Sequence, residues 1–143
     1  PIPEEEWLNP YISKLNLSSD VESAANYGDI IFIAVPTPFK NGKTCLDYII
    51  SALISISKNF SKGKILVIES TVPPGTTEGL VRKIIEEKTE LKAGKDFGLV
   101  FSPERIDPGN KKNMIWNTPK VVGGIDPVST EIVGVYPIRT ILS

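Results

Sequence analysis

Three turns in this sequence place polar side chains directly after apolar segments. The first is Val35-Pro36-Thr37-Pro38, the second (69–77) has the sequence ESTVPPGTT, and the third (101–110) has the sequence FSPERIDPGN. Each turn follows a run rich in Val, Ile, Leu or Phe, which is typical of a buried strand. Open α/β sheets bind ligands at the carboxyl ends of their strands. The three turns together therefore predict one shared site.

The first turn holds a threonine between two prolines. Proline fixes its own backbone and keeps the residue before it extended. Thr37 can therefore present its hydroxyl and backbone to a dinucleotide from the end of a strand. The same two prolines also suit a turn that does no more than stiffen the exit from the strand, and the residues alone leave both interpretations open.

The second turn combines hydroxyls with a glycine. Thr71 precedes the prolines and can orient a water or a cofactor amide, whereas Gly75 allows a close backbone approach. The following helix start favours anions. Ser70 or Thr76 can instead cap that helix with its hydroxyl. We assign capping to Thr76 and a functional role to Thr71.

The third turn carries a carboxylate and a guanidinium. Glu104 at a strand end can act as a base toward a bound water, and Arg105 can bind an anionic group with two hydrogen bonds. A plain surface loop with a Glu and an Arg is the commoner case in isolation.

Cys45 is the single cysteine, and the chain has no histidine to activate it, so we predict an incidental cysteine and not a nucleophile. We predict no metal site.

Composition limits the class of protein. With 143 residues the chain has the size of one domain. A net charge of −1 argues against a nucleic-acid partner, because neutralising phosphates needs a basic surface. The longest apolar run, 30–35, is too short to span a membrane, and the acidic start has no signal-peptide pattern. One cysteine fits a reducing compartment, so we predict a cytoplasmic protein with no membrane partner.

Apolar periodicity predicts alternating helices and strands. We expect strands over 30–35, from 65 to the Ser70-Thr71 pair, over 97–101 and over 120–123. The first is nearly all apolar and is predicted to be buried on both faces. Helices are expected over 3–15, from Asp20 to about Gly28, over 46–60 with Gly63 closing it, over 76–89, and from 126 to an irregular end near Gly134 and Pro137. A polar loop should surround Asn41-Gly42. This order indicates an α/β fold with a Rossmann-like doubly wound parallel sheet.

Four segments in this order, AVPTP, IESTVPPGTT, FSPERIDPGN and PKVVGGID, resemble the UDP-glucose/GDP-mannose dehydrogenase family over about residues 20–132. Within the family, SPERIDPGN looks most like the UDP-N-acetyl-D-mannosamine dehydrogenase branch. The resemblance implies an oxidoreductase of polysaccharide biosynthesis that uses two NAD to oxidise the C6 alcohol of a nucleotide sugar to a carboxylate. In that reaction a cysteine captures the aldehyde, and hydrolysis of the thioester releases the acid.

The resemblance also assigns roles to the residues of the three turns. Thr71 and Glu104 would be catalytic, because the first helps to hold the hydrolytic water and the second assists the water and the thioester step. The residues implied at the cofactor are Pro36, Thr37, Ser70 and Thr71. Those implied at the substrate are Glu104, Arg105 and Asn110. Pro108 stands where the UDP-glucose branch has a second glutamate, so that role is vacant or differently filled.

Some family motifs have no counterpart in the 143 residues. The chain contains no G-x-G, the pyrophosphate-binding turn of dinucleotide-binding folds. Cys45 does not match the motif of the family's nucleophile, and no dimerisation helix or UDP-sugar domain is matched. We therefore expect residues 1–143 to form one partial dinucleotide-binding domain, the second part of an NAD-binding domain, that is inactive alone.

Two alternatives remain for this chain. It can be a non-catalytic remnant that folds and self-associates, because a strand over 30–35 without a second neighbour exposes an apolar edge. It can also be a hydroxyacid or hydroxyacyl dehydrogenase. STVPPGTT together with SPERIDPGN disfavours that last assignment.

Overall fold

The structure, a computed structural model, describes residues 16–105 and 118–142. The helix predicted over 3–15 lies outside these residues. In chain order the elements are α2 (Val21–Tyr27), β1 (Ile30–Ile33), β2 (Phe39–Lys40), β3 (Lys43–Thr44), α3 (Asp47–Ser57), β4 (Ile65–Ile68), the π-helical turn η1 (Thr77–Val81), α4 (Arg82–Thr89), β5 (Gly98–Phe101), β6 (Gly123–Gly124) and α5 (Pro127–Leu142).

A four-stranded sheet in the order β1-β4-β5-β6 forms the centre of the fold. Strands β1, β4 and β5 are parallel and in register, with Ile30 opposite Ile65 and Ile65 opposite Gly98. Strand β6 is short and antiparallel to β5. The predicted fourth strand thus exists, but it covers Gly123–Gly124 and not 120–123.

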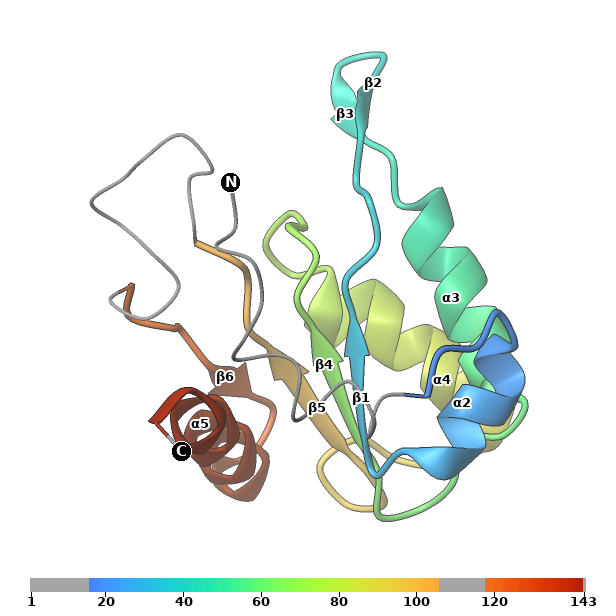
Figure 1. The fold of residues 1–143 in the computed structure, drawn as a ribbon. Helices are drawn as coiled ribbons and strands as arrows, with labels where there is room; N and C mark the ends of the chain where they lie inside the picture. Colours follow the sequence, from blue (N-terminus) through green and yellow to red (C-terminus); the bar gives the residue numbers. More distant parts are fainter. Residues whose placement is uncertain (1–15, 106–117, 143) are drawn as a thin grey trace.

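Helices cover both faces of the sheet. Helices α2, α3 and α4 lie on one face and α5 lies on the other (Figure 1). Side chains of β4 alternate between the two cores, because Leu66 and Ile68 belong to the core beneath the three helices, whereas Ile65 and Val67 pack with Val133 of α5. This arrangement confirms the predicted doubly wound α/β fold.

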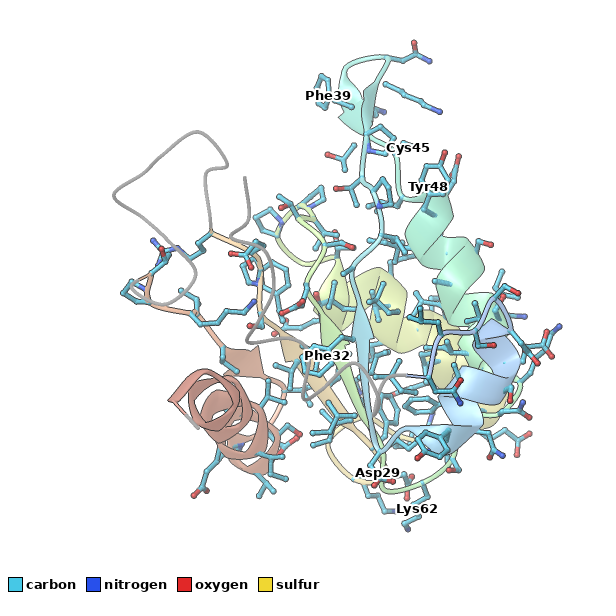
Figure 2. The ribbon with its side chains drawn as sticks, viewed as in Figure 1. Asp29, Phe32, Phe39, Cys45, Tyr48 and Lys62 are labelled. Carbon is cyan, nitrogen blue, oxygen red and sulfur yellow. The ribbon has the colours of Figure 1, made fainter. Side chains whose placement is uncertain are left out.

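Strand β1 differs from its prediction. It ends at Ile33, and Phe32 is 42% exposed, so the prediction that this strand is buried on both faces was wrong. Among the described strands β1 pairs with β4 alone, and α5 packs over β5 and β6. Phe32 therefore lies on a part of the sheet that no described helix covers (Figure 2).

The caps of the helices explain several boundaries. Asp20 Oδ1 accepts a hydrogen bond from the Ser23 amide at 3.0 Å, and Gly28 ends α2, as predicted. Helix α3 ends at Ser57. Gly63 does not close it, because this glycine has φ 90° in the turn that enters β4.

Helix α5 runs through Gly134 and Pro137, which were expected to make its end irregular. None of the helices in the described part of the chain is long and apolar enough to cross a membrane.

Two further segments differ from their predictions. The expected helix over 76–89 is divided into η1 and α4. The expected polar loop is a hairpin, in which β2 and β3 pair antiparallel around Asn41 and Gly42 with φ 51° and 75°. Two residues with positive φ are the signature of a tight hairpin turn. The hairpin projects from the edge where β1 ends (Figure 1).

Close packing of β6 on α5 gives the first prediction. A β-carbon at Gly124 would lie 2.8 Å from the Thr130 amide nitrogen and 3.0 Å from the Asp126 carbonyl oxygen, whereas one at Gly123 would meet nothing within 4 Å. Because the first turn of α5 must move to admit it, Gly124→Ala should lower the free energy of unfolding by about 1–3 kcal/mol. Gly123→Ala is the matched control and should change it by less than about 0.5 kcal/mol. Urea denaturation followed by circular dichroism measures both, and equal midpoints would contradict the packing.

Candidate functional site

The three polar turns meet at one edge of the sheet. They follow β1, β4 and β5, which are adjacent and parallel, so their carboxyl ends lie side by side (Figure 1). Thr37, Thr71 and Glu104 each come three or four residues after one of these strands. The structure therefore brings together three of the residues that the sequence singled out.

Hydrogen bonds join the first turn to the second. The Thr37 hydroxyl donates to the Thr71 carbonyl oxygen at 2.8 Å. Ser70 Oγ accepts from the Val35 amide at 2.8 Å and donates to the Val35 carbonyl oxygen at 2.8 Å. The Ser70 side chain, which is 7% exposed, thus takes the place of a strand neighbour where β1 and β4 separate.

These contacts exclude the alternative that Ser70 caps a helix and correct the capping role assigned to Thr76. Ser70 does not cap the following helix, because its hydroxyl bonds across the sheet to Val35. Thr76 occupies the position before η1, but its side chain makes no capping hydrogen bond, so the capping role assigned to it was wrong. The reason is that η1 begins with Thr76 already in a helical conformation, whereas a capping residue has an extended backbone.

The surface of the first two turns is accessible and lined by small groups. Thr71 and Pro36 are exposed, and Thr37 is half-buried between them. Gly75 has φ 80°, and a β-carbon there would meet nothing within 4 Å. Accessible hydroxyls and carbonyls at neighbouring strand ends suit the carboxamide of a nicotinamide ring, so these residues fit a dinucleotide.

A charged cluster joins the second turn to the third. Lys120 Nζ lies 2.6 Å from Glu69 Oε1 and 3.7 Å from Glu104 Oε2. Glu104 Oε1 accepts from the Arg105 amide at 2.6 Å. Arg105 is exposed, and Asn110 lies outside the described residues. Glu69 and Lys120 could not be connected from the sequence, because the two are 51 positions apart and no spacing rule relates them.

One buried polar atom lies directly after β5. Ser102 follows β5 and is 1% exposed, and within the described part of the chain its hydroxyl has no hydrogen-bond partner. Its amide donates to the Ile68 carbonyl oxygen at 2.9 Å. Buried hydroxyls are usually paired with protein or with ordered water, so Ser102 Oγ marks a place where a water can bind at the strand ends.

One surface hollow lies beside the second turn, and Thr37, Thr71 and Glu104 are not among the residues that line it. It has a volume of about 440 Å³, and its walls come from the Val72–Gly75 loop, the start of η1, β5 and the segment 123–125. The polar groups argued above lie at the strand ends outside it. Geometry at the strand ends therefore defines the candidate site better than this hollow does.

The described carboxylates with shifted pKa values lie away from the three turns. Hydrogen bonds from the Arg82 side chain and the Ala93 amide lower the pKa of Glu86 to about 2. Ser129 lowers the pKa of Asp126 through its hydroxyl and its amide. Both carboxylates hold helix and loop ends together. Their pKa shifts therefore reflect structure, and they do not mark a second reaction centre.

A largely parallel sheet with helices on both faces and polar turns at its carboxyl edge is the arrangement of Rossmann-type dinucleotide-binding domains. Residues 5–136 match the model of the NAD binding domain of the UDP-glucose/GDP-mannose dehydrogenase family, and the chain belongs to this family. Its cofactor is accordingly NAD. The site predicted from three turns is thus part of an NAD-binding domain.

Named relatives agree with this assignment. The chain is 33% identical to a UDP-N-acetyl-D-mannosamine dehydrogenase of Pyrococcus horikoshii over 80% of its own length and 27% of that protein's. It is 37% identical to a UDP-N-acetyl-D-glucosamine 6-dehydrogenase of Pseudomonas aeruginosa over 73% of its length and 25% of that protein's. A solved structure of UDP-D-ManNAc dehydrogenase from P. horikoshii has a TM-score of 0.81 and 27% identity, covering 94% of this chain and 31% of that one. The chain thus spans about a quarter of the length of the relatives it matches.

The bond between Ser70 and Val35 gives the second prediction. Ser70→Ala removes the acceptor of the partly buried Val35 amide, and an unsatisfied buried donor costs about 1–3 kcal/mol. The free energy of unfolding should fall by that amount in chemical denaturation. Ser51→Ala, at an exposed position on α3, is the control and should be neutral or stabilising by about 0.5 kcal/mol. Equal losses in the two variants would show that the Ser70 bond does not hold β1 and β4 together.

Proposed function

We propose that this chain is the NAD-binding part of a nucleotide-sugar 6-dehydrogenase, which oxidises the C6 alcohol of UDP-N-acetyl-D-mannosamine to a carboxylate. The observation that carries the proposal is the junction of two strand ends, where the Thr37 hydroxyl binds the Thr71 carbonyl oxygen at 2.8 Å. Membership of the family supports the reaction class.

Each residue of the strand ends receives a role in this proposal. Pro36 and Thr37 flank NAD, and Ser70 holds the two turns at the spacing that the cofactor requires. When bound, NAD supplies the hydride acceptor. Thr71, exposed beside Thr37, orients the hydrolytic water. Glu104 accepts a proton from that water, because a carboxylate at a strand end can act as a general base.

The choice of sugar rests on the third turn and on the relatives. Proteins named UDP-N-acetyl-D-mannosamine dehydrogenase are among those that the chain matches, and so are proteins named UDP-N-acetyl-D-glucosamine 6-dehydrogenase. SPERIDPGN favours the mannosamine branch. Arg105 is exposed next to Glu104 and can bind an anionic group of the substrate with two hydrogen bonds.

A chimera tests this proposal. Residues 16–134 would replace the aligned segment of the P. horikoshii enzyme, and NADH formation from UDP-N-acetyl-D-mannosamine would be followed at its absorbance maximum. We expect the chimera to form NADH and Glu104→Gln to slow it roughly a hundredfold, because general bases contribute about 10²–10⁴ to a rate. A folded chimera that binds NAD and forms no NADH would contradict the proposal.

The 143-residue chain is the control for that chimera. We propose that it forms no NADH alone, and that calorimetry detects no tight binding of NAD to it, because its sequence contains no G-x-G turn. Micromolar affinity of the chain alone would overturn this part of the proposal. Circular dichroism and gel filtration of the chimera beside its parent separate a folding failure from a catalytic one.

A second candidate function is self-association as a non-catalytic folded module. The observation that favours it is the edge of β1, because none of the described strands pairs with that edge and Phe32 beside it is 42% exposed. An unpaired apolar strand is a template for pairing with another chain. Phe32 lies away from the helices α2, α3 and α4 (Figure 2), so a second copy can reach it.

Sedimentation velocity tests the second candidate. At tens of micromolar we expect the 143-residue chain to sediment as a dimer or larger species, and Phe32→Lys to shift it toward the monomer, because a lysine on an edge strand opposes pairing. Phe39→Lys is the matched control, since Phe39 is 74% exposed on the hairpin and away from the β1 edge. A monodisperse monomer in the unsubstituted chain would count against self-association.

A further inference from the structure

A single ammonium group connects the ends of two strands. Lys120 lies three residues before β6, and its Nζ approaches Glu69 at the end of β4 and Glu104 after β5. The two carboxylates come from neighbouring parallel strands, and the lysine comes from the antiparallel segment beside them. Three chain segments that are separate in sequence thus share one charge cluster.

This cluster differs from an ordinary surface ion pair. The side chains of Lys120 and Glu69 are 27% and 26% exposed, whereas those of the helical pair Lys83 and Glu87 are 70% and 64% exposed. The distance of 2.6 Å from Lys120 to Glu69 is that of a short charge-assisted hydrogen bond. Exposed pairs add little to stability because solvent screens them. The Lys120 ammonium is partly buried and is held by Glu69, so its position is defined.

That fixed position orients Glu104. One oxygen of its carboxylate accepts from the Arg105 amide at 2.6 Å, and the other lies 3.7 Å from Lys120 Nζ. A carboxylate acts as a base only where its lone pairs can reach the proton that it accepts. The Glu104 side chain is 49% exposed, so the Arg105 amide and Lys120 are two of the groups that can restrict its rotation, and Glu69 holds Lys120 at 2.6 Å.

We infer that Lys120 is a positioning residue for Glu104, and that Glu69 is the anchor for Lys120. The inference rests on the proposed function, because it needs Glu104 to act on the hydrolytic water. It assigns a role to two residues that the sequence did not single out. Glu69 also carries a carboxylate, but we assign it no part in the chemistry, since Lys120 neutralises its charge.

Amide hydrogen exchange tests the positioning without any turnover. In the 143-residue chain labelled with ¹⁵N, Lys120→Met should speed exchange of the Arg105 amide, because its acceptor Glu104 loses the ammonium that lies 3.7 Å from its second oxygen. Lys120→Arg should leave that exchange as in the unsubstituted chain. The Ser102 amide, which donates to Ile68 within the sheet, is the internal reference and should not change. Lys83→Met removes an exposed lysine from α4 and is the matched control.

Kinetics of the chimera test the consequence for the reaction. Lys120→Met should lower kcat by roughly ten- to a hundredfold, the cost of a misplaced catalytic group, with the KM for NAD changed little. Lys120→Arg should recover most of kcat, and the kcat of Glu69→Gln should lie between those of Lys120→Met and Lys120→Arg. Because a smaller folded fraction also lowers the apparent kcat at an unchanged KM, circular dichroism of each variant beside its parent must show equal folding, and the rescue by arginine then makes the pattern specific to positioning.

The possible outcomes separate the inference from the proposed function. Either of two results in Lys120→Met overturns the role of Lys120 alone. One is unchanged exchange of the Arg105 amide, and the other is an unchanged kcat in a chimera that Glu104→Gln slows. Full activity of Glu104→Gln overturns the proposed role of Glu104, and the inference with it. Faster exchange together with a lowered kcat that arginine restores supports both.

Discussion

Strand β4 is buried at all four of its residues, and both layers of helices pack against it. It also pairs with β1 on one side and with β5 on the other. Removing apolar side chains from water on both faces is worth about 1.5–3 kcal/mol for each large residue, so the position of this strand is strongly determined. Glu69, Ser70 and Thr71 follow it without a break. The second turn is therefore placed by the core and needs no contacts of its own to stay at the sheet edge.

The two neighbouring turns depend on β4 in different ways. The first is joined to it by neutral hydrogen bonds, in which Ser70 binds Val35 and Thr37 binds Thr71. The third is joined to it by charge, through Lys120. Neutral bonds between backbone and hydroxyl hold a short and fixed spacing, which suits the surface against which the proposed nicotinamide would lie. The ammonium of Lys120, which Glu69 holds at 2.6 Å, keeps a positive charge beside Glu104, the carboxylate proposed as a general base.

Periodicity and turn chemistry predicted the parts of the fold that depend on local sequence. The start of α2 at Asp20 and the buried strand before Ser70 follow from capping and from apolar runs, and the structure has both. The hairpin was missed although Asn41-Gly42 is a strong signal for it, because its strands have two residues each and show no alternation. The role of Ser70 could not be predicted, since its partner Val35 is 35 positions away. The contact between Lys120 and Glu69 depends on tertiary structure in the same way.

The exposure of Phe32 shows how the two candidate functions compete for one strand. A strand that pairs with β1 in parallel brings its own carboxyl end beside Thr37, where a phosphate-binding turn would complete a dinucleotide site. A second copy related by a two-fold axis pairs β1 with β1 antiparallel, because such an interface is the same on both subunits. It then brings the amino end of the partner's strand to that place, with no turn to receive a phosphate. Occupation of the β1 edge by a second copy is therefore incompatible with the cofactor site proposed at Thr37, and the direction of the strand that pairs with β1 would decide between the two candidate functions.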